Sequence, residues 1–303
     1  MKQKRGVVAV DVGGTKIASG LYLESGEVLY RKSEATVQES AEASVDRLVR
    51  LVGEAVEAAP RDVVAAGVGV VIPGWVDHKR KTVWAPNIVG WDHIPLGAML
   101  AERLPLPILV DSDRSGYVRG EAWLGVARGL RDVVFLAVGT GIGAGILADG
   151  RIIHGADDLA GAVGWMALDP AFDDLYTRMG CFEAEASGNS AGRKAASRLG
   201  VPGLTSRDLL SRAATGEPQA RGIVEELALY IGMGIANLVS TLNPEMVVLG
   251  GGLFASDLLL APVRREAARW AQPFAAKGVR IELSALGEEA GLAGAARIAF
   301  DNI

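Results

Sequence analysis

The chain has 303 residues, a formal net charge of −5 at pH 7, 50% hydrophobic and 22% charged residues. This length and composition are typical of a globular protein with two lobes and exclude a disordered or low-complexity chain. The acidic charge argues against a nucleic-acid-binding surface, and the single cysteine, Cys181, excludes a disulfide framework and fits a reducing cytoplasm.

The first predicted strand, Val7 to Val10, is apolar and leads directly into a polar, glycine-containing run. That run is Asp11, Val12, Gly13, Gly14, Thr15 and Lys16. Glycines let a phosphate approach main-chain N–H groups, and a carboxylate at Asp11 can hold a hydrated Mg²⁺ beside that phosphate. The pattern predicts a nucleotide site; the alternative is a Gly-Gly hairpin turn after an edge strand.

Strands and helices alternate through the rest of the first half. Residues 17–35 alternate in polarity and break at Ser25-Gly26, which predicts a meander of strands. An amphipathic helix is expected at 41–59. Two apolar strands, 63–72 and 108–110, then end at Pro73-Gly74 and at Asp111-Ser112-Asp113, as buried parallel strands do. The loop at 83–94 carries Asn87 as its candidate inward polar group.

The second half repeats this plan. An apolar strand at 133–138 precedes a turn of Gly139, Thr140, Gly141, Ile142, Gly143, Ala144 and Gly145, with the next strand expected at 146–148. A third strand, 246–249, ends at Gly250, Gly251 and Gly252. The remaining elements are helices at 189–199, 206–214 with Ser206 as N-cap, 219–242, 257–271 and 288–300, and a strand at 279–283. The fold class is therefore α/β. No membrane span is expected, because the most apolar helix contains Glu225 and Glu226.

Three glycine turns after buried strands do not fit a dinucleotide-binding unit, whose glycines open a helix. The first two lead into strands instead. Two such turns could clamp a triphosphate, with the third under an adenosine. The alternative is that the glycines serve only tight hairpins.

These motifs resemble the ROK family (repressors, open reading frames and kinases) over nearly the whole chain. The resemblance implies a two-lobed actin/hexokinase-like (ribonuclease H-like) ATPase fold, with one lobe at 1–117 plus 288–303 and the other at 118–287. It implies a cytoplasmic, homodimeric, ATP- and Mg²⁺-dependent kinase acting on a hydroxyl of a sugar or polyol, with no nucleic acid or membrane partner. Its nucleotide motifs match Asp11 to Lys16, Gly139 to Gly145 and Pro244 to Gly252.

The resemblance also implies roles for residues at the sugar. The family's catalytic carboxylate matches Asp113, in a run where both asparagines of the family have become Ser112 and Ser115. A carboxylate there would accept the proton of the attacking hydroxyl; the alternative is that Asp113 caps the following helix. The residues expected to shape the sugar pocket are Gly74, Asn87, Asp113, Trp165 and Glu183, with Asp157 or Asp158 as further candidates.

The chain departs from the family at its Glu-x-Gly-His motif, where Ala162 and Trp165 replace the glutamate and histidine. Only Cys181 remains of the family's zinc-binding cysteines, so no structural zinc is expected. The three histidines, His78, His93 and His154, lie on separate loops, which favours surface or pocket-wall positions over a metal site. Cys181 is expected to be a small buried residue.

Two explanations of Ala162 and Trp165 remain. In the first, the protein is a kinase with a non-standard acceptor, and Trp165 stacks on a ring. In the second, it is a catalytically weak or inactive relative that binds sugar or nucleotide in a regulatory role. The retained Asp11, Asp113 and Glu183 favour the first, because a carboxylate without a role in a pocket carries a desolvation cost.

Overall fold

The computed structural model describes residues 3–36 and 38–303, which form two compact units. Among the described residues, unit 1 contains 3–36, 38–129, 154–159 and 288–303, and unit 2 contains 130–153 and 160–287. The lobes expected from the sequence differ from these units at 118–129 and at 154–159, both of which belong to unit 1. Residues 1, 2 and 37 lie outside the described part of the chain.

Unit 1 is built on a five-stranded sheet in the order β3-β2-β1-β4-β7. Its strands are β1 (Lys4–Val12), β2 (Lys16–Leu23), β3 (Val28–Ala35), β4 (Val63–Ile72) and β7 (Ile108–Ser112). The first three strands pair antiparallel, which confirms the predicted meander, while β1, β4 and β7 are parallel. A short hairpin joins β5 (Trp75–Asp77) to β6 (Thr82–Trp84). The carboxyl ends of β1 and β7, which carry Asp11 and Asp111, therefore meet at one edge of the sheet.

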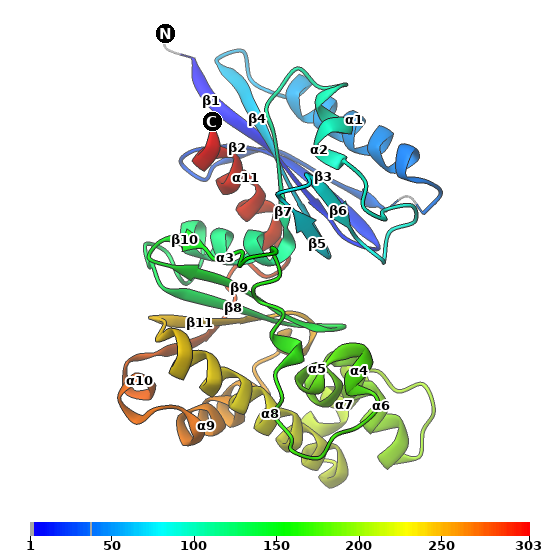
Figure 1. Cartoon of the computed structure of the whole chain (residues 1–303), viewed down its shortest axis with the longest axis vertical. Coiled ribbons are helices and arrows are strands. Elements are labelled where there is room, and N and C mark those ends of the chain that lie inside the picture. The colour runs from blue at the N-terminus through cyan, green and yellow to red at the C-terminus, as the bar shows by residue number, and fades with distance from the viewer. Residues whose placement is uncertain (1–2, 37) are drawn as a thin grey trace. The chain divides into compact units, whose positions relative to one another are not determined.

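Helices cover both faces of this sheet (Figure 1). The four helices are α1 (Ala41–Glu57), α2 (Leu96–Ala101), α3 (Asp113–Leu124) and α11 (Ala290–Asn302). Alternate residues of β1 point to opposite faces: Val8 and Val10 pack with α1, while Val7 and Ala9 pack with α11. The continuous apolar sequence of β1 is thus explained by burial on both sides.

Small residues let α11 approach its neighbours very closely. A Cβ built on Gly294 would overlap the carbonyl oxygen of Gly116 in α3, and one on Gly69 of β4 would overlap that of Ala295. At its first turn, a Cβ on Gly291 would overlap the carboxylate of Asp11. The glycines thus bring the start of α11 against the end of β1.

Unit 2 repeats the sheet plan in the order β10-β9-β8-β11-β12. Its strands are β8 (Val133–Val138), β9 (Ile142–Ala148), β10 (Arg151–Ile152), β11 (Met246–Gly250) and β12 (Arg280–Leu283). Its helices are α4 (Tyr176–Met179), α5 (Cys181–Ala186), α6 (Gly188–Leu199), α7 (Ser206–Ala214), α8 (Pro218–Leu242), α9 (Leu260–Trp270) and α10 (Pro273–Gly278), with single 3₁₀ turns η1 (Val163–Trp165) and η2 (Gly252–Phe254).

Among the described helices, α8 alone is long and apolar enough to cross a membrane by length and composition. However, 61% of its most apolar window is buried, and Leu227, Ile231 and Ile235 are fully buried in the unit 2 core. Burial of this kind is what a core helix of a globular protein shows.

Two local predictions were wrong. The second glycine turn ends at Gly141, and β9 begins at Ile142 rather than Ile146, because Gly143 and Gly145 pair with β8. The N-cap of α7 is Thr205, not Ser206: its hydroxyl accepts a hydrogen bond from the Asp208 amide, and the Asp208 side chain accepts from the Thr205 amide. This reciprocal pair is a capping box with aspartate in place of the usual glutamate.

Candidate active site

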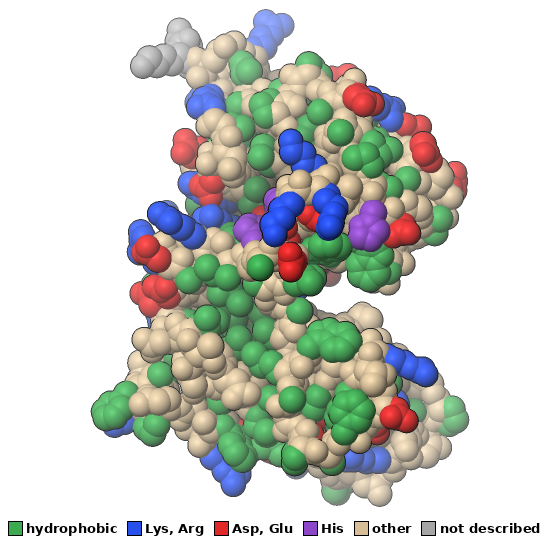
Figure 2. Space-filling view, viewed as in Figure 1, with side chains coloured by type: hydrophobic (Ala, Val, Ile, Leu, Met, Phe, Trp, Pro, Cys, Tyr) green, Lys and Arg blue, Asp and Glu red, His purple; other side chains and the backbone are tan. Residues whose placement is uncertain are grey.

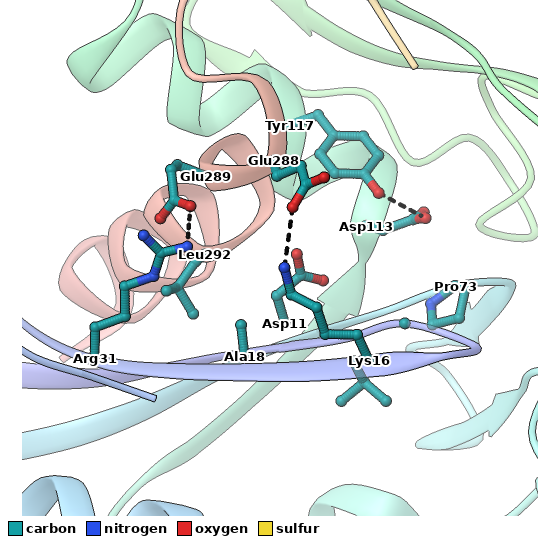
Figure 3. A pocket seen from close by; sticks show the side chains of 12 residues that line it. Asp11, Lys16, Ala18, Arg31, Pro73, Asp113, Tyr117, Glu288, Glu289 and Leu292 are labelled. Carbon is teal, nitrogen blue, oxygen red and sulfur yellow. Dashed lines mark hydrogen bonds and ion pairs between the residues drawn. The ribbon is translucent and has the colours of Figure 1, made fainter. Parts of the chain in front are cut away.

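Asp11 and Asp113 line one small cavity of unit 1, about 110 Å³ in volume (Figure 3). Gly13, Lys16 and Tyr117 contribute to the same wall. The cavity lies where β1 ends and α3 begins, at the carboxyl edge of the parallel strands. Ligands of open α/β sheets bind at this edge, so two candidate residues from distant parts of the sequence meet where a site is expected.

Asp113 is the first residue of α3 and does not cap it. The N-cap is Ser112, whose hydroxyl accepts a hydrogen bond from the Ser115 amide at 3.3 Å. The Tyr117 hydroxyl donates to the Asp113 carboxylate at 3.3 Å. Burial raises the pKa of the Asp113 carboxyl to about 6, against the opposing effects of Arg114 and of the Tyr117 hydrogen bond. The capping alternative is therefore wrong.

Asp11 carries the stronger perturbation. Burial, followed by the negative charge of Asp113, raises the pKa of the Asp11 carboxyl to about 7, although Lys16 opposes this. Two carboxyl groups that share one poorly solvated cavity do not ionise together easily. A divalent cation beside Asp11 would remove this conflict, so the donor group fits the Mg²⁺ position that the sequence predicts.

The first glycine turn is held in place by residues that the sequence did not indicate. The Gly13 amide donates to the Lys16 carbonyl at 2.8 Å, and the Thr36 hydroxyl donates to the Gly13 carbonyl at 2.6 Å. The Gln38 side-chain amide donates to the Gly14 carbonyl at 2.8 Å and to the Asn87 carbonyl at 3.3 Å. A Cβ on Gly14 would lie 3.5 Å from that of Asn87, so the structure brings Asn87 beside the glycine turn.

Ion pairs complete the cavity wall. Lys16 Nζ lies 3.0 Å from a Glu288 carboxylate oxygen, and Arg31 pairs with Glu289. Figure 3 shows both pairs on the side of the cavity formed by the start of α11. Sequence reasoning missed Arg31, Tyr117 and both glutamates. Only Tyr117 had a local signal, because it follows Asp113 by four residues on a helix and therefore shares its face.

Thr15 of the first glycine turn is exposed. Gly74 has a positive φ of 110°, and a Cβ atom at this position would overlap the Trp84 carbonyl oxygen. Gly74 follows Pro73, which lines the Asp11 cavity. Its predicted position at the end of β4 is therefore at the same edge of the sheet as Asp113. These are all residues of unit 1.

In unit 2, the second and third glycine turns lie side by side. Gly251 has a φ of 91°, and a Cβ there would lie 2.5 Å from the Val138 carbonyl and 2.9 Å from the Gly139 amide nitrogen. The Gly139 carbonyl accepts a hydrogen bond from Gly188, the first residue of α6, at 2.7 Å. The ends of β8 and β11 and the start of α6 therefore lie close together and contact one another through backbone atoms. Anions and nucleotides bind at backbone arrangements of this kind. Gly250 is buried at the end of β11, Thr140 and Gly252 are exposed, and Gly143 lies within β9.

Glu183 and Trp165 lie near this second turn. A Glu183 carboxylate oxygen accepts a hydrogen bond from the Ile142 amide at 2.7 Å, and burial raises the pKa of the Glu183 carboxyl despite that bond. A Cβ on Gly164 would lie 3.1 Å from that of Glu183, so η1 packs against the glutamate. Trp165, which ends η1, is 58% exposed. Its indole is available for contact with another molecule.

Two further predictions can be compared with the structure. Cys181 is 5% exposed and accepts a hydrogen bond from the Leu168 amide, which confirms a small buried residue. The histidines lie on separate loops and reach the surface, as expected, but two of them are neighbours in space. His78 and His154 come together with Asp158, so two of the three histidines form a group able to hold a metal ion. Nothing in their sequence spacing, 76 residues, signals this contact.

Comparison with known proteins agrees with this geometry. The sequence profile of the ROK family matches residues 7–302. A glucokinase from Halalkalibacterium halodurans is 31% identical over 96% of this chain and 93% of its own. A ROK hexokinase structure from Thermus thermophilus superimposes with a TM-score of 0.86 at 31% identity, covering 97% of this chain and 98% of that one.

A ROK family glucokinase structure from Streptomyces griseus, in complex with glucose and AMPPNP, superimposes with a TM-score of 0.81 at 32% identity. It covers 98% of this chain and 100% of that one. These similarities confirm the predicted actin/hexokinase-like fold. On the profile match and the whole-chain identity together, the chain belongs to the ROK family.

Proposed function

We propose that the chain is an ATP-dependent carbohydrate kinase in which Asp113 is the general base for a sugar hydroxyl. The observation that carries this proposal is the Asp113 carboxyl. It lies in the cavity beside Asp11, does not serve as the N-cap of α3, and has a pKa of about 6. A general base is most effective when its pKa lies near the working pH. The glucokinase and hexokinase relatives support the same reaction class.

In the proposed phosphoryl transfer, residues of unit 1 bind the cation and phosphate and accept the proton of the acceptor hydroxyl. Bound ATP supplies the phosphoryl group, and Mg²⁺ neutralises charge on the phosphates. Asp11 would hold the cation through a water molecule. Asp113 accepts the proton of the attacking hydroxyl, and Tyr117 holds the Asp113 carboxylate in position through its hydrogen bond. The turn residues Gly13, Gly14, Thr15 and Lys16 bind phosphate.

Unit 2 contributes the rest of the proposed binding groups. The backbone of Gly139, Thr140, Gly141 and Gly143 binds phosphate, and Gly250, Gly251 and Gly252 lie under the adenosine. The proposed acceptor is a sugar or sugar-like polyol, and the residues proposed to bind it are Gly74, Asn87, Trp165 and Glu183. Trp165 supplies an exposed indole where the family has a histidine, which favours stacking on a ring over hydrogen bonding.

A coupled assay of ADP release over hexoses, amino sugars, cyclitols and nucleosides tests the function. We expect acceptor-stimulated turnover with at least one compound and its loss in Asp113→Ala. Turnover that persists in this variant would contradict the role of Asp113. An absence of stimulated turnover over the whole panel would contradict the kinase.

A second candidate is a weak or inactive relative that binds sugar or nucleotide. The replacement of two polar sugar-binding residues by Ala162 and Trp165 favours it. Saturable binding of glucose or ATP by calorimetry, without phosphoryl transfer, would support this candidate. We also propose a homodimer, which light scattering would report as about twice the 31.6 kDa chain mass.

A further inference from the structure

Two histidines distant in sequence meet a carboxylate in unit 1, outside the cavity of Asp11 and Asp113. His78 lies in the turn between β5 and β6, while His154 and Asp158 lie on the segment that follows β10. One ligand atom from each of the three lies within 4.8 Å of the others. The side chains of His78 and His154 are 40% and 36% exposed, so the group is accessible from solvent. Figure 2 shows histidine side chains that reach the surface.

Both histidines approach the same carboxylate oxygen. The Nδ1 atoms of His78 and His154 lie 2.9 Å and 4.0 Å from the same oxygen, Oδ1 of Asp158. Two ligand atoms of a tetrahedral zinc ion lie about 3.4 Å apart, so these two distances bracket the required one. Two imidazoles and one carboxylate are a donor set for zinc and similar transition metals rather than for Mg²⁺ or Ca²⁺.

A second carboxylate faces the far side of one imidazole. His154 Nε2 lies 3.7 Å from Oδ2 of Asp111, which is 6% exposed. The other oxygen of Asp111 accepts a hydrogen bond from the Ser112 amide at 2.7 Å, so this carboxylate is fixed. Histidines that bind metals commonly donate their other ring nitrogen to a carboxylate, which sets the tautomer and the ring orientation.

Hydrogen bonds also hold the β5–β6 hairpin against the segment that carries His154 and Asp158. The Trp75 indole donates to the Asp157 carbonyl at 2.9 Å, and the His78 amide donates to Asp158 Oδ2 at 3.0 Å. The neighbouring cations do not occupy the carboxylate, since Lys79 pairs with Asp157 and Arg80 with Asp77. Asp158 is 10% exposed in its side chain and has a positive φ of 57°, so its direction is set by the fold.

We propose that His78, His154 and Asp158 bind one zinc ion, with Asp111 as the residue that orients His154. Water completes the coordination of the ion. The site is separate from the zinc site whose cysteines this chain lacks, because Cys181 belongs to unit 2 and none of the three ligands is a thiol. Bound zinc links the β5–β6 turn to the 154–159 segment. The proposal does not depend on the kinase reaction.

Titration of the chelator-treated full chain with zinc tests the site. We expect calorimetry to give one equivalent bound at about 50 µM protein, which requires a Kd of about 1 µM or lower. Cobalt, as a spectroscopic substitute, is expected to give visible bands without thiolate charge transfer. Zinc is also expected to raise the melting temperature of the protein, because it binds only the folded state.

The variants separate this site from other zinc ligands. His154→Gln and Asp158→Asn are expected to weaken zinc binding about 100-fold or more, and Asp111→Asn about 10-fold. Asparagine tolerates the left-handed backbone at residue 158. The matched control is His93→Asn, an exposed histidine of the same unit that also has a positive φ, 53°. Together with Cys181→Ala, it is expected to leave zinc affinity unchanged.

Each possible outcome decides the proposal. Substoichiometric binding to the unmodified chain, tight binding that persists in His154→Gln, or loss of binding in Cys181→Ala would each overturn it. Far-ultraviolet circular dichroism of the metal-free variants checks that they fold. If one does not, the cobalt spectrum of the unmodified chain still decides between imidazole–carboxylate and thiolate ligands.

Discussion

The carboxyl of Asp113 is held in a state from which it can accept a proton near neutral pH. Its usual competing role, capping α3, is taken by Ser112. Burial supplies the raised pKa, and Tyr117 supplies a donor that stabilises the carboxylate. The chemistry of this position therefore depends on its solvation as much as on the identity of the acid.

Asp113→Asn removes the base while keeping the shape of the side chain. We expect kcat to fall about 10³-fold, within the range for loss of general base catalysis. Asp92→Asn, a change of the same type at an 83% exposed carboxylate, is the control and should leave kcat unchanged. In the unmodified enzyme, log(kcat/KM) should rise with pH and level off above about 6, where Asp113 is deprotonated. A flat profile across this range would contradict the assignment.

Asp11→Asn is expected to stabilise the protein in the absence of Mg²⁺. The folded-state pKa of Asp11, about 7, lies above the ordinary value of 3.8, so the folded state binds more protons than the unfolded state between these limits. Its contribution to stability is therefore present below pH 3.8 and is lost as the pH rises through 7. At pH 8 we expect the variant to gain about 1–3 kcal/mol in urea unfolding. A loss of stability at pH 8 would refute this account.

Single residues were predictable where the signal was local. Asp11 and Asp113 follow apolar strands, and parallel strands end at one edge, so their meeting could be expected. The pairs Lys16–Glu288 and His78–Asp158 could not, because their partners are 272 and 80 residues apart. Only the packing of α11 and of the 154–159 segment brings these side chains together.

At the scale of elements, the periodicity of apolar residues predicted the strands of both sheets and the long helices except α3, which was expected only from the family resemblance. The exceptions have two causes. The short helices α2, α4, α5 and α10 have four to six residues, too few to show a helical period. The early start of β9 was missed because its glycines indicated a turn, whereas β8 and the neighbouring elements hold them in a ladder.

The contact between α3 and α11 is so close that one added methyl group is expected to lower the stability of the protein. A Cβ on Gly294 would overlap the Gly116 carbonyl, so Gly294→Ala should lower the free energy of unfolding by about 3 kcal/mol. Gly53→Ala is the control, because Gly53 of α1 has nothing within 4 Å of the added atom. That change should stabilise the protein by about 0.5–1 kcal/mol. Equal effects of the two changes would show that the close contact is unimportant.

At the scale of the whole molecule, each unit has its own sheet and its own apolar core. Unit 1 carries the candidate cation ligand, and both units carry glycine turns. Ligand binding should therefore be visible as stabilisation of the folded chain as well as through turnover.

ATP with Mg²⁺ is expected to raise the melting temperature. At 100 times the Kd, binding corresponds to about 2.7 kcal/mol. We expect Asp11→Asn to lose the part of this shift that depends on Mg²⁺ and to keep the part that ATP gives alone. Differential scanning calorimetry with ATP, with and without excess chelator, measures both parts. An identical Mg²⁺ dependence in the variant would place the cation elsewhere.

The close packing of α11 has a consequence for the order of biosynthesis. Val7, Ala9 and Ala18 of the first strands are buried by Leu292 and other residues of α11, and 158 residues separate unit 1's first segment from its last, counting 130 to 287. During translation, this face of the first sheet therefore stays uncovered until unit 2 has been made. Unit 2 can therefore fold before α11, the last helix of unit 1, has been synthesised. Until then a chaperone that binds apolar strands can bind the exposed face of the first sheet.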